Sequence, residues 1–184
     1  MASRKIMVIR HAEKPDDEGR ILGVDEQAHH DPEELTVRGW QRAGALVRFF
    51  VPPDRHFTDA RIETPDVIFA SAVAKHSKSL RPQHTVGPLA DVLGREKLRL
   101  DFTEGQEMQL AQAAITAGEV ALISWHHEMI PAIKDALLQD QSPPRKWPNH
   151  RFDLVWIFSR SGKGWNFEQV PQLLLAGDAR DAIV

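Results

Sequence analysis

Three short apolar segments constrain the fold of this 184-residue chain more than any other feature. We expect strands over Lys5–Ile9, Val67–Ala70 and Glu119–Ser124, each of which is apolar almost throughout. Strands of this kind are buried on both faces, as in a parallel sheet that helices cover on its two sides. Segments with a helical pattern separate them, so the sequence predicts an α/β fold with a mainly parallel central sheet.

Four segments show the apolar periodicity that is typical of amphipathic helices. Thr36 is the expected N-cap of the first helix and Ser79 that of the second, while Gly94 and Gly118 are expected stop signals. The expected helices and their apolar faces are 36–50 with Trp40, Ala43, Val47 and Phe50, 80–93 with Val86, Leu89, Ala90 and Leu93, 106–117 with Met108, Ala111 and Ile115, and a helix beginning near Pro131 with Ile130, Ile133 and Leu137.

The remaining segments complete the expected architecture. Phe152–Phe158 and Trp165–Val170 flank a short polar segment that contains glycine, which predicts an antiparallel hairpin. Leu98–Leu100 is expected to form a short edge strand, and the polar segment Lys14–Glu34 a long functional loop. We therefore expect one domain over residues 1–184, a three-layer α/β/α sandwich with a mainly parallel central sheet and a C-terminal antiparallel hairpin.

Composition and charge argue against several classes of protein. The formal net charge is −3 and no block of Lys and Arg occurs, which argues against a nucleic-acid-binding surface. The chain has no cysteine, so disulfides and thiol chemistry are excluded. The segment Met1–Lys5 lacks the pattern of a signal peptide, and no apolar run approaches the length of a membrane span. We expect a soluble cytoplasmic protein that binds neither nucleic acid nor membrane, in an oligomeric state that the sequence leaves open.

Polar residues directly follow the three expected strands. They are Arg10-His11 after the first, Ser71 after the second and Ser124–His127 at the end of the third. In open α/β sheets, ligands bind at the carboxyl ends of the strands. A neutral imidazole can attack phosphorus when nearby guanidinium groups lower its pKa and hold the phosphate oxygens, and a carboxylic acid can protonate the leaving oxygen. These residues therefore indicate phosphoryl transfer through a histidine.

Four sequence blocks, in order along the chain, resemble motifs of the histidine phosphatase superfamily, which has the phosphoglycerate-mutase-like fold. The blocks are Val8–Pro15, similar to the R-H-G/A-E signature in its RHAEKP variant, Leu35–Ala43, similar to L-T-x-x-G-x-x-x-A, Arg81–Ala90, similar to R-x-x-x-T…P-L-A, and Val120–His127, similar to the strand before the second catalytic histidine. Each block alone is a weak signal, whereas four in the expected order are a strong one.

The resemblance implies roles for the residues that match the motifs. His11 is then the nucleophile that becomes phosphorylated, and Arg10, Arg81 and His127 complete the phosphate pocket. The spacing W-x-H-x-x-I-P of RHAEKP-type relatives fits His127 rather than His126, which would line the rim or orient its neighbour.

The chain departs from the family pattern in two places. The family has a serine close before its second arginine, whereas Ser71, the candidate for substrate binding, lies ten positions before Arg81. We expect the intervening Lys75–Lys78 to lengthen a loop over the site. The Glu-rich segment that supplies the acid of the family mutases is not found here. Three candidates for the proton donor remain open, namely Glu13, Glu104 and Glu107.

These residues predict a metal-independent phosphatase of the histidine acid type, which hydrolyses phosphate monoesters through a phosphohistidine on His11 and needs no cofactor. The expected substrate is a small phosphorylated molecule, with a phosphoprotein left open. The sequence shows no group of residues that would clamp a carboxylated substrate, which favours hydrolysis over mutase chemistry. A phosphoglycerate-mutase-type phosphotransferase and a non-catalytic phosphate-binding regulatory domain are the alternatives. No H-x-x-x-H or H-E-x-x-H spacing supports a metal site.

Overall fold

The framework of the protein is one six-stranded sheet with the strand order β3-β2-β4-β1-β5-β6. The computed structural model describes residues 4–16, 18–162 and 164–184, so Met1–Ser3 of the N-terminal segment, Asp17 of the long loop and Lys163 of the hairpin turn lie outside the described residues. The strands are β1 (Lys5–Arg10), β2 (Val67–Ala70), β3 (Leu98–Arg99), β4 (Val120–Trp125), β5 (Leu154–Ser161) and β6 (Gly164–Pro171).

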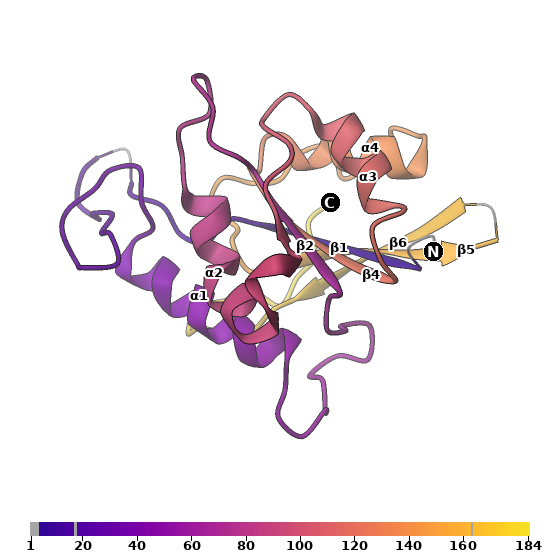
Figure 1. Cartoon of the computed structure of the whole chain (residues 1–184), viewed down its shortest axis with the longest axis horizontal. Helices are drawn as coiled ribbons and strands as arrows, with labels where there is room; N and C mark the ends of the chain where they lie inside the picture. The colour runs from indigo at the N-terminus through magenta and orange to yellow at the C-terminus, as the bar shows by residue number, and fades with distance from the viewer. Residues whose placement is uncertain (1–3, 17, 163) are drawn as a thin grey trace.

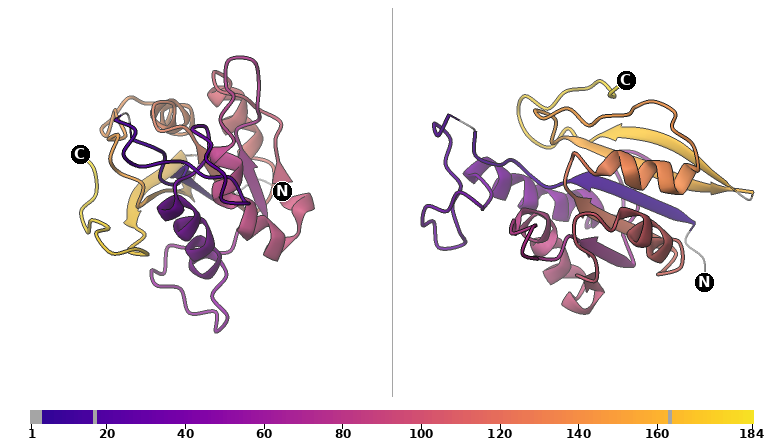
Figure 2. Two further views of the ribbon diagram at one scale, coloured as in Figure 1. Left: turned by 90° about the vertical axis from the view of Figure 1, so that its left-hand side faces the viewer. Right: turned by 90° about the horizontal axis from the view of Figure 1, so that it is seen from above.

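The sheet combines a parallel part with an antiparallel hairpin, as predicted. β2 is parallel to β3 and β4, β4 is parallel to β1, and β5 is antiparallel to both β1 and β6. In the register of the sheet, Val8 of β1 lies between Ile123 of β4 and Trp156 of β5. Figure 2 (right) shows the hairpin along one edge of the sheet, beyond β1. Leu100, expected in the edge strand, lies beyond β3 and is exposed.

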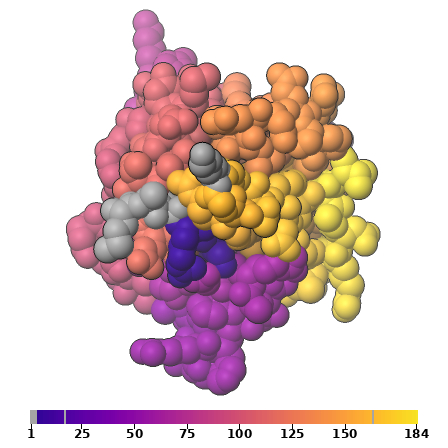
Figure 3. Space-filling view, turned by 90° about the vertical axis from the view of Figure 1, so that its right-hand side faces the viewer, coloured from indigo at the N-terminus to yellow at the C-terminus, as the bar shows by residue number. Residues whose placement is uncertain are grey.

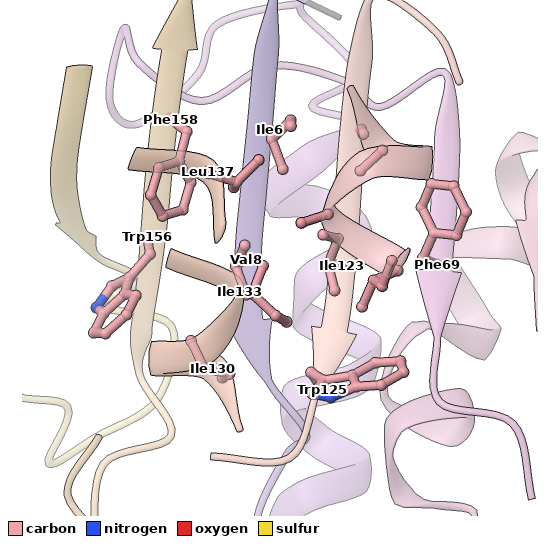
Figure 4. Close-up of a cluster of buried hydrophobic side chains, with 14 of the residues drawn as sticks. Ile6, Val8, Phe69, Ile123, Trp125, Ile130, Ile133, Leu137, Trp156 and Phe158 are labelled. Atoms are coloured by element: carbon pink, nitrogen blue, oxygen red, sulfur yellow. The ribbon is translucent and has the colours of Figure 1, made fainter. Parts of the chain in front are cut away.

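Helices cover both faces of the sheet, which confirms the three-layer α/β/α architecture (Figure 1). The cluster in Figure 4 lies on the α3–α4 side and includes Ile6 and Val8 of β1, whereas Met7 and Ile9 belong to the cluster on the α1–α2 side. Alternate residues of one strand therefore enter two separate cores, which explains why the apolar run is continuous. The helices are α1 (Val37–Phe50), α2 (Arg81–Leu93), α3 (Glu107–Ala114) and α4 (Ile130–Leu138), with a single 3₁₀ turn η1 (Arg95–Lys97).

Of the four expected signals at helix ends, Thr36 and Gly94 are confirmed, whereas Ser79 is not the N-cap of α2 and Gly118 does not end α3. The Thr36 side chain accepts a hydrogen bond from the Gly39 amide at 3.1 Å, which confirms Thr36 as the N-cap of α1. The expectation for α2 was wrong by one residue, because Leu80 is the N-cap and makes no side-chain capping bond. Ser79 Oγ still accepts a hydrogen bond from the Arg81 amide at 3.3 Å. At the other end of α2, Gly94 ends the helix with a φ of 110°, a conformation that favours glycine.

The predicted apolar face of α3 was right at Ala111 and wrong at Met108, and the predicted length was wrong. Met108 is 70% exposed, and the helix ends at Ala114 instead of Ala117. Its buried face contains Leu110 and Ala111 and begins with the carboxylate of Glu107. Glu107 Oε1 accepts a hydrogen bond from Trp125 Nε1 at 2.9 Å, so a charged residue takes a core position that a count of apolar residues misses.

The two ends of the sheet differ in how they are closed. Figure 3 looks at the end where β1 begins, between the hairpin and the segment after α1. Here Lys5 Nζ donates to the Arg61 carbonyl oxygen at 2.7 Å and lies 2.5 Å from Glu63 Oε1. The opposite end, where β1, β2 and β4 finish, carries the long loops. In the described ranges, no helix is long and apolar enough to cross a membrane.

Gly39 offers a test of how closely α1 approaches the loop after β1. A Cβ atom at Gly39 would lie 2.5 Å from the Glu13 carbonyl oxygen and 3.1 Å from Leu35 Cβ. We expect Gly39→Ala to lower the free energy of unfolding by about 1–3 kcal/mol, because backbone atoms must move apart. Urea denaturation followed by circular dichroism measures the change.

Gly44 in the same helix is the matched control, since a Cβ there would meet nothing within 4 Å. Gly44→Ala should leave the stability unchanged or raise it by up to about 1 kcal/mol through helix propensity. Equal effects of the two substitutions would contradict the close packing of α1 on the Glu13 segment.

Candidate active site

A cavity of about 470 Å³ lies beyond the carboxyl ends of β1, β2 and β4. Five residues that the sequence predicted as site candidates line it: His11 after β1, His126 and His127 after β4, Arg81 at the start of α2, and Glu104 after β3. Arg10, the last residue of β1, is buried directly before His11 and is not among the lining residues. The loop between β2 and α2, which stands out from the top of the molecule in Figure 1, forms another wall. The structure therefore brings together side chains from three separate blocks of the sequence, as the parallel topology requires.

The His11 imidazole is buried and fixed in one orientation. Its Nδ1 lies 2.8 Å from the Ala12 carbonyl oxygen, which can only accept a hydrogen bond, so Nδ1 carries the proton. Thr85 Oγ1 accepts a hydrogen bond from the Ala12 amide at 2.7 Å and ties this turn to α2. Burial and the nearby Arg10 cation hold the pKa of His11 well below its usual value. The ring is therefore neutral at neutral pH, and the Nε2 lone pair is available as a nucleophile.

Arg10 is a buried cation with only part of its guanidinium group in use. Nη1 donates to the Asn149 carbonyl oxygen at 2.6 Å and to the Arg151 carbonyl oxygen at 3.2 Å, with a longer contact of 3.3 Å to that of Pro148. The guanidinium carbon lies 3.8 Å from the centre of the Phe152 ring. Nε and Nη2 are buried and have no hydrogen-bond partner in the described part of the chain. Burial lowers the pKa of Arg10 to about 10, so the group stays charged at neutral pH.

Arg81 is held at the cavity by the long loop between β1 and α1. Its Nε donates to the Glu34 carbonyl oxygen at 3.2 Å and its Nη2 to the Pro32 carbonyl oxygen at 2.8 Å. Burial lowers the pKa of Arg81 from its usual value. The loop predicted over Lys14–Glu34 therefore has an identifiable structural role, because its backbone carbonyl groups orient Arg81.

The two histidines after β4 face different neighbours. The ring centres of His126 and His11 lie 5.8 Å apart, and His126 Nε2 is buried with no hydrogen-bond partner among the described residues. His127 Nε2 lies 2.7 Å from Asn149 Oδ1, and its Nδ1 lies 3.0 Å from Glu128 Oε2. Burial lowers the pKa of both rings. Both rings line the cavity, and the geometry alone does not choose His127 over His126.

The structure does not bring Ser71 to the cavity. This residue is completely buried, and its hydroxyl donates to the Ala72 carbonyl oxygen at 3.3 Å. The backbone oxygen of Ser71 accepts a hydrogen bond from Gln83 of α2. Ser77 and Ser79 line the cavity instead. The family pattern, in which a serine lies close before the second arginine, points to these two serines. The position of Ser71 directly after β2 was the misleading signal.

Glu13 points away from the cavity and binds α1. Its carboxylate accepts hydrogen bonds from Arg42 Nη2 at 2.9 Å and from Arg38 Nε at 3.1 Å. Arg42 is itself buried and also binds Asp178 near the C-terminus, at 2.7 Å. These contacts assign Glu13 to an ion-pair network between α1, the loop after His11 and the C-terminal segment. They do not place its carboxyl group where a leaving oxygen would lie.

The other two acid candidates differ in their surroundings. Glu107 is held in the core by Trp125 Nε1 and by the Gly105 amide, which donates to Oε1 at 3.0 Å. Glu104, by contrast, lines the cavity. Burial, and the nearby negative charge of Glu128, raise the pKa of Glu104. Of the three candidates, Glu104 alone combines a place on the cavity wall with a pKa shift toward the protonated form. Across the described ranges, no cluster of three or more His, Asp or Glu side chains is arranged to hold a metal ion.

The fold is α/β, and the cavity at its strand ends is lined by Arg81 and by the three histidines His11, His126 and His127. No family model and no curated protein sequence matches this chain. Among solved structures, similar folds are those of the protein histidine phosphatase SixA complexed with tungstate (14% identity, TM-score 0.52, covering 91% of this chain and 97% of that one) and of an alpha-ribazole phosphatase from Shigella flexneri (14%, 0.50, 89% and 94%).

A third similar structure is that of the product of open reading frame Rv3214 from Mycobacterium tuberculosis, with 13% identity, a TM-score of 0.51, and coverage of 93% of this chain and 98% of that one. The likeness to these structures confirms the phosphoglycerate-mutase-like α/β fold that the motifs imply.

The two unused donors of Arg10 predict that the cavity binds a tetrahedral oxyanion. We expect inorganic phosphate to bind at pH 7, and Arg10→Met to weaken the affinity about tenfold to hundredfold, because hydrogen bonds to charged groups contribute about 1.5–3 kcal/mol. Isothermal titration calorimetry measures the dissociation constants. Arg145→Met, which removes an exposed guanidinium outside the cavity, is the control. Equal affinities of the two variants would contradict the assignment of Arg10.

Proposed function

We propose that this protein is a phosphatase that hydrolyses phosphate monoesters through a phosphohistidine on His11. One observation carries the proposal: the buried imidazole of His11 has its Nδ1 proton engaged by the Ala12 carbonyl oxygen, which leaves Nε2 free beside the Arg10 cation. The names of two proteins with a similar fold add support, because both are phosphatases. Superfamily likeness supports a phosphatase broadly, and the phosphohistidine step rests on the geometry of His11.

The proposed reaction has two displacement steps. His11 Nε2 attacks phosphorus, so that a P–N bond forms and the P–O bond to the alcohol breaks, with its electron pair going to the leaving oxygen. An acid protonates that oxygen. Water then attacks the phosphohistidine, returns a proton to the same carboxylate, and releases inorganic phosphate and neutral His11. Arg10 and Arg81 would hold the non-bridging oxygens with their planar donors, and the second histidine would add a further hydrogen bond.

Glu104 is the proton donor that the geometry supports best. A general acid needs a pKa close to the working pH, and the pKa of Glu104 is shifted upward by burial and by Glu128. Glu13 is engaged by Arg42 and Arg38, and Glu107 by Trp125, so neither carboxyl group faces a leaving oxygen at His11.

Loss of the nucleophile is the direct test of the proposed function. We expect the wild-type protein to release phosphate from an aryl phosphate, with the rate unaffected by EDTA, and His11→Ala to lose at least about 10³-fold in kcat/KM. His56→Ala, at an exposed histidine remote from the cavity, is the control. Acid-labile, base-stable label from radioactive substrate should appear in the wild type and be absent from His11→Ala.

Each of the other outcomes would indicate a different function. Equal turnover by wild type and His11→Ala removes His11 from the mechanism, and activity abolished by EDTA favours metal-dependent hydrolysis. Phosphate binding without turnover in the wild type favours a non-catalytic regulatory domain. Transfer of the phosphoryl group to a second hydroxyl, instead of release as inorganic phosphate, favours a mutase-type phosphotransferase.

The pH profile and the leaving group together test Glu104. The reaction requires neutral His11 and protonated Glu104, so kcat/KM should rise through the lowered pKa of His11 and fall through the raised pKa of Glu104. In Glu104→Gln the fall of kcat/KM at alkaline pH should disappear. The kcat/KM for an alkyl phosphate should also decrease about 10²–10⁴-fold, because a poor leaving group needs the proton.

For a nitrophenyl phosphate, whose leaving oxygen is stable as an anion, kcat/KM should decrease much less in the same variant. Glu13→Gln and Glu107→Gln are the comparison variants, and we expect them to affect both substrates in the same proportion. If the selective loss on alkyl phosphate appears in Glu13→Gln or Glu107→Gln instead, the assignment of Glu104 is wrong.

A further inference from the structure

The loop between β2 and α2 brings two lysines to the cavity that the proposed chemistry does not use. Lys75 and Lys78 are exposed, and both line the cavity that contains His11. The loop is closed as a tight turn, in which the Ala74 amide donates to the Ser77 carbonyl oxygen at 2.8 Å and the Ser77 amide to that of Ala74 at 3.0 Å. The lysines therefore project from a hydrogen-bonded turn, which fixes where their stems begin.

The carboxylates of the cavity wall do not neutralise these lysines. Glu33 Oε2 lies 3.7 Å from Arg81 Nη2, and Glu128 Oε2 lies 3.0 Å from His127 Nδ1. The third carboxyl group, Glu104, makes no ion pair with either lysine in the described part of the chain. Among the described residues, neither Lys75 nor Lys78 makes an ion pair or a side-chain hydrogen bond. The mouth of the cavity thus carries positive charge in excess of what its own acids balance.

The lysines lie beside the path that the rest of a substrate would take. The proposed nucleophile His11 is a buried residue of the cavity, whereas Lys75 and Lys78 line the same cavity and are exposed. A phosphoryl group on His11 would therefore leave its alcohol part facing this loop. An ammonium group on a flexible stem binds carboxylates and phosphates as a point charge, without the fixed geometry of a guanidinium.

We propose that Lys75 and Lys78 form a second anion subsite, which selects phosphomonoesters whose alcohol part carries a further carboxylate or phosphate. The proposal rests on the proposed function for the role of the first subsite. It also changes one expectation from the sequence, in which no group able to clamp a carboxylated substrate was visible. The fold supplies such a group from a loop that looked like an insertion.

Binding of matched phosphonates tests the subsite without requiring turnover. The probes are propylphosphonate, its analogue with a terminal carboxylate, and its analogue with a terminal second phosphonate, titrated by calorimetry at low salt. We expect the wild type to bind the two doubly charged probes roughly two- to fivefold more tightly than propylphosphonate, the range for exposed ion pairs. The ratio should fall towards one in the double variant Lys75→Gln/Lys78→Gln.

Lys146→Gln is the matched control, because Lys146 is exposed and does not line the cavity, and it should keep the wild-type ratio. The comparison between the carboxylate and phosphonate probes shows which second anion the subsite prefers. Absence of any preference in the wild type, or a preference that survives in the double variant, overturns the subsite.

Hydrolysis of the corresponding phosphate esters separates this proposal from the proposed function. Turnover of propyl phosphate without any charge preference rejects the subsite and leaves the phosphatase in place. A lysine-dependent binding preference without hydrolysis of any ester supports the subsite and rejects the phosphatase. If none of the three phosphonates binds, both proposals are wrong.

Discussion

The buried guanidinium of Arg10 is the feature on which the rest of the site depends. Removing this cation from water costs several kcal/mol, and three backbone carbonyl groups of residues 148–151 and the face of Phe152 offset part of that cost. Those contacts fix the segment before β5 against the end of β1. They also determine which donors of Arg10 remain for an anion. Burial and the same cation lower the pKa of His11, so Arg10 would contribute both to the proposed anion binding and to the proposed activation of the nucleophile.

The charged residues of the signature Arg10–Glu13 make contacts in two different places. His11 lines the cavity and Arg10 is buried directly before it, whereas Glu13 binds Arg42 of α1. Arg42 in turn reaches Asp178, which lies 136 positions further along the sequence. The ion-pair network therefore joins the segment that carries His11, the proposed nucleophile, to the first helix and to the C-terminal end. The motif therefore contains one charged residue, Glu13, whose contacts are structural.

The predictability of this fold follows from what apolar periodicity can and cannot detect. Strands such as β1 and β4, whose residues all enter a core, were found to within a residue or two because burial selects side chains at every position. The face of α3 was missed because Glu107 occupies a core position, where a hydrogen bond from Trp125 compensates its burial. Such compensation comes from a residue distant in the sequence, and a local pattern carries no trace of it.

The candidate site shows the same limit at the level of single residues. His11, Arg81, His126 and His127 could be placed at one cavity from the motifs and the strand order. Ser71 could not be excluded, because only the structure shows that Gln83 of α2 covers the end of β2. The sequence likewise does not distinguish the three glutamates Glu13, Glu104 and Glu107, which differ only in the groups that surround their carboxylates in the fold. The direction of a side chain at the end of an element depends on tertiary contacts. For this reason, motif position led to one candidate for the nucleophile and left three for the acid.

The proposed acid and nucleophile require opposite protonation states, and the fold gives each a separate environment. His11 lies next to Arg10 and deep among core residues, so burial and a cation both favour the neutral ring. Glu104 lies on the loop after β3, away from that cation, where burial and the negative charge of Glu128 favour the protonated carboxyl. Glu128 also lies 3.0 Å from His127 Nδ1. One carboxylate thus acts on both walls of the cavity, and two titratable groups acquire opposite tasks because they follow different strands of the same sheet.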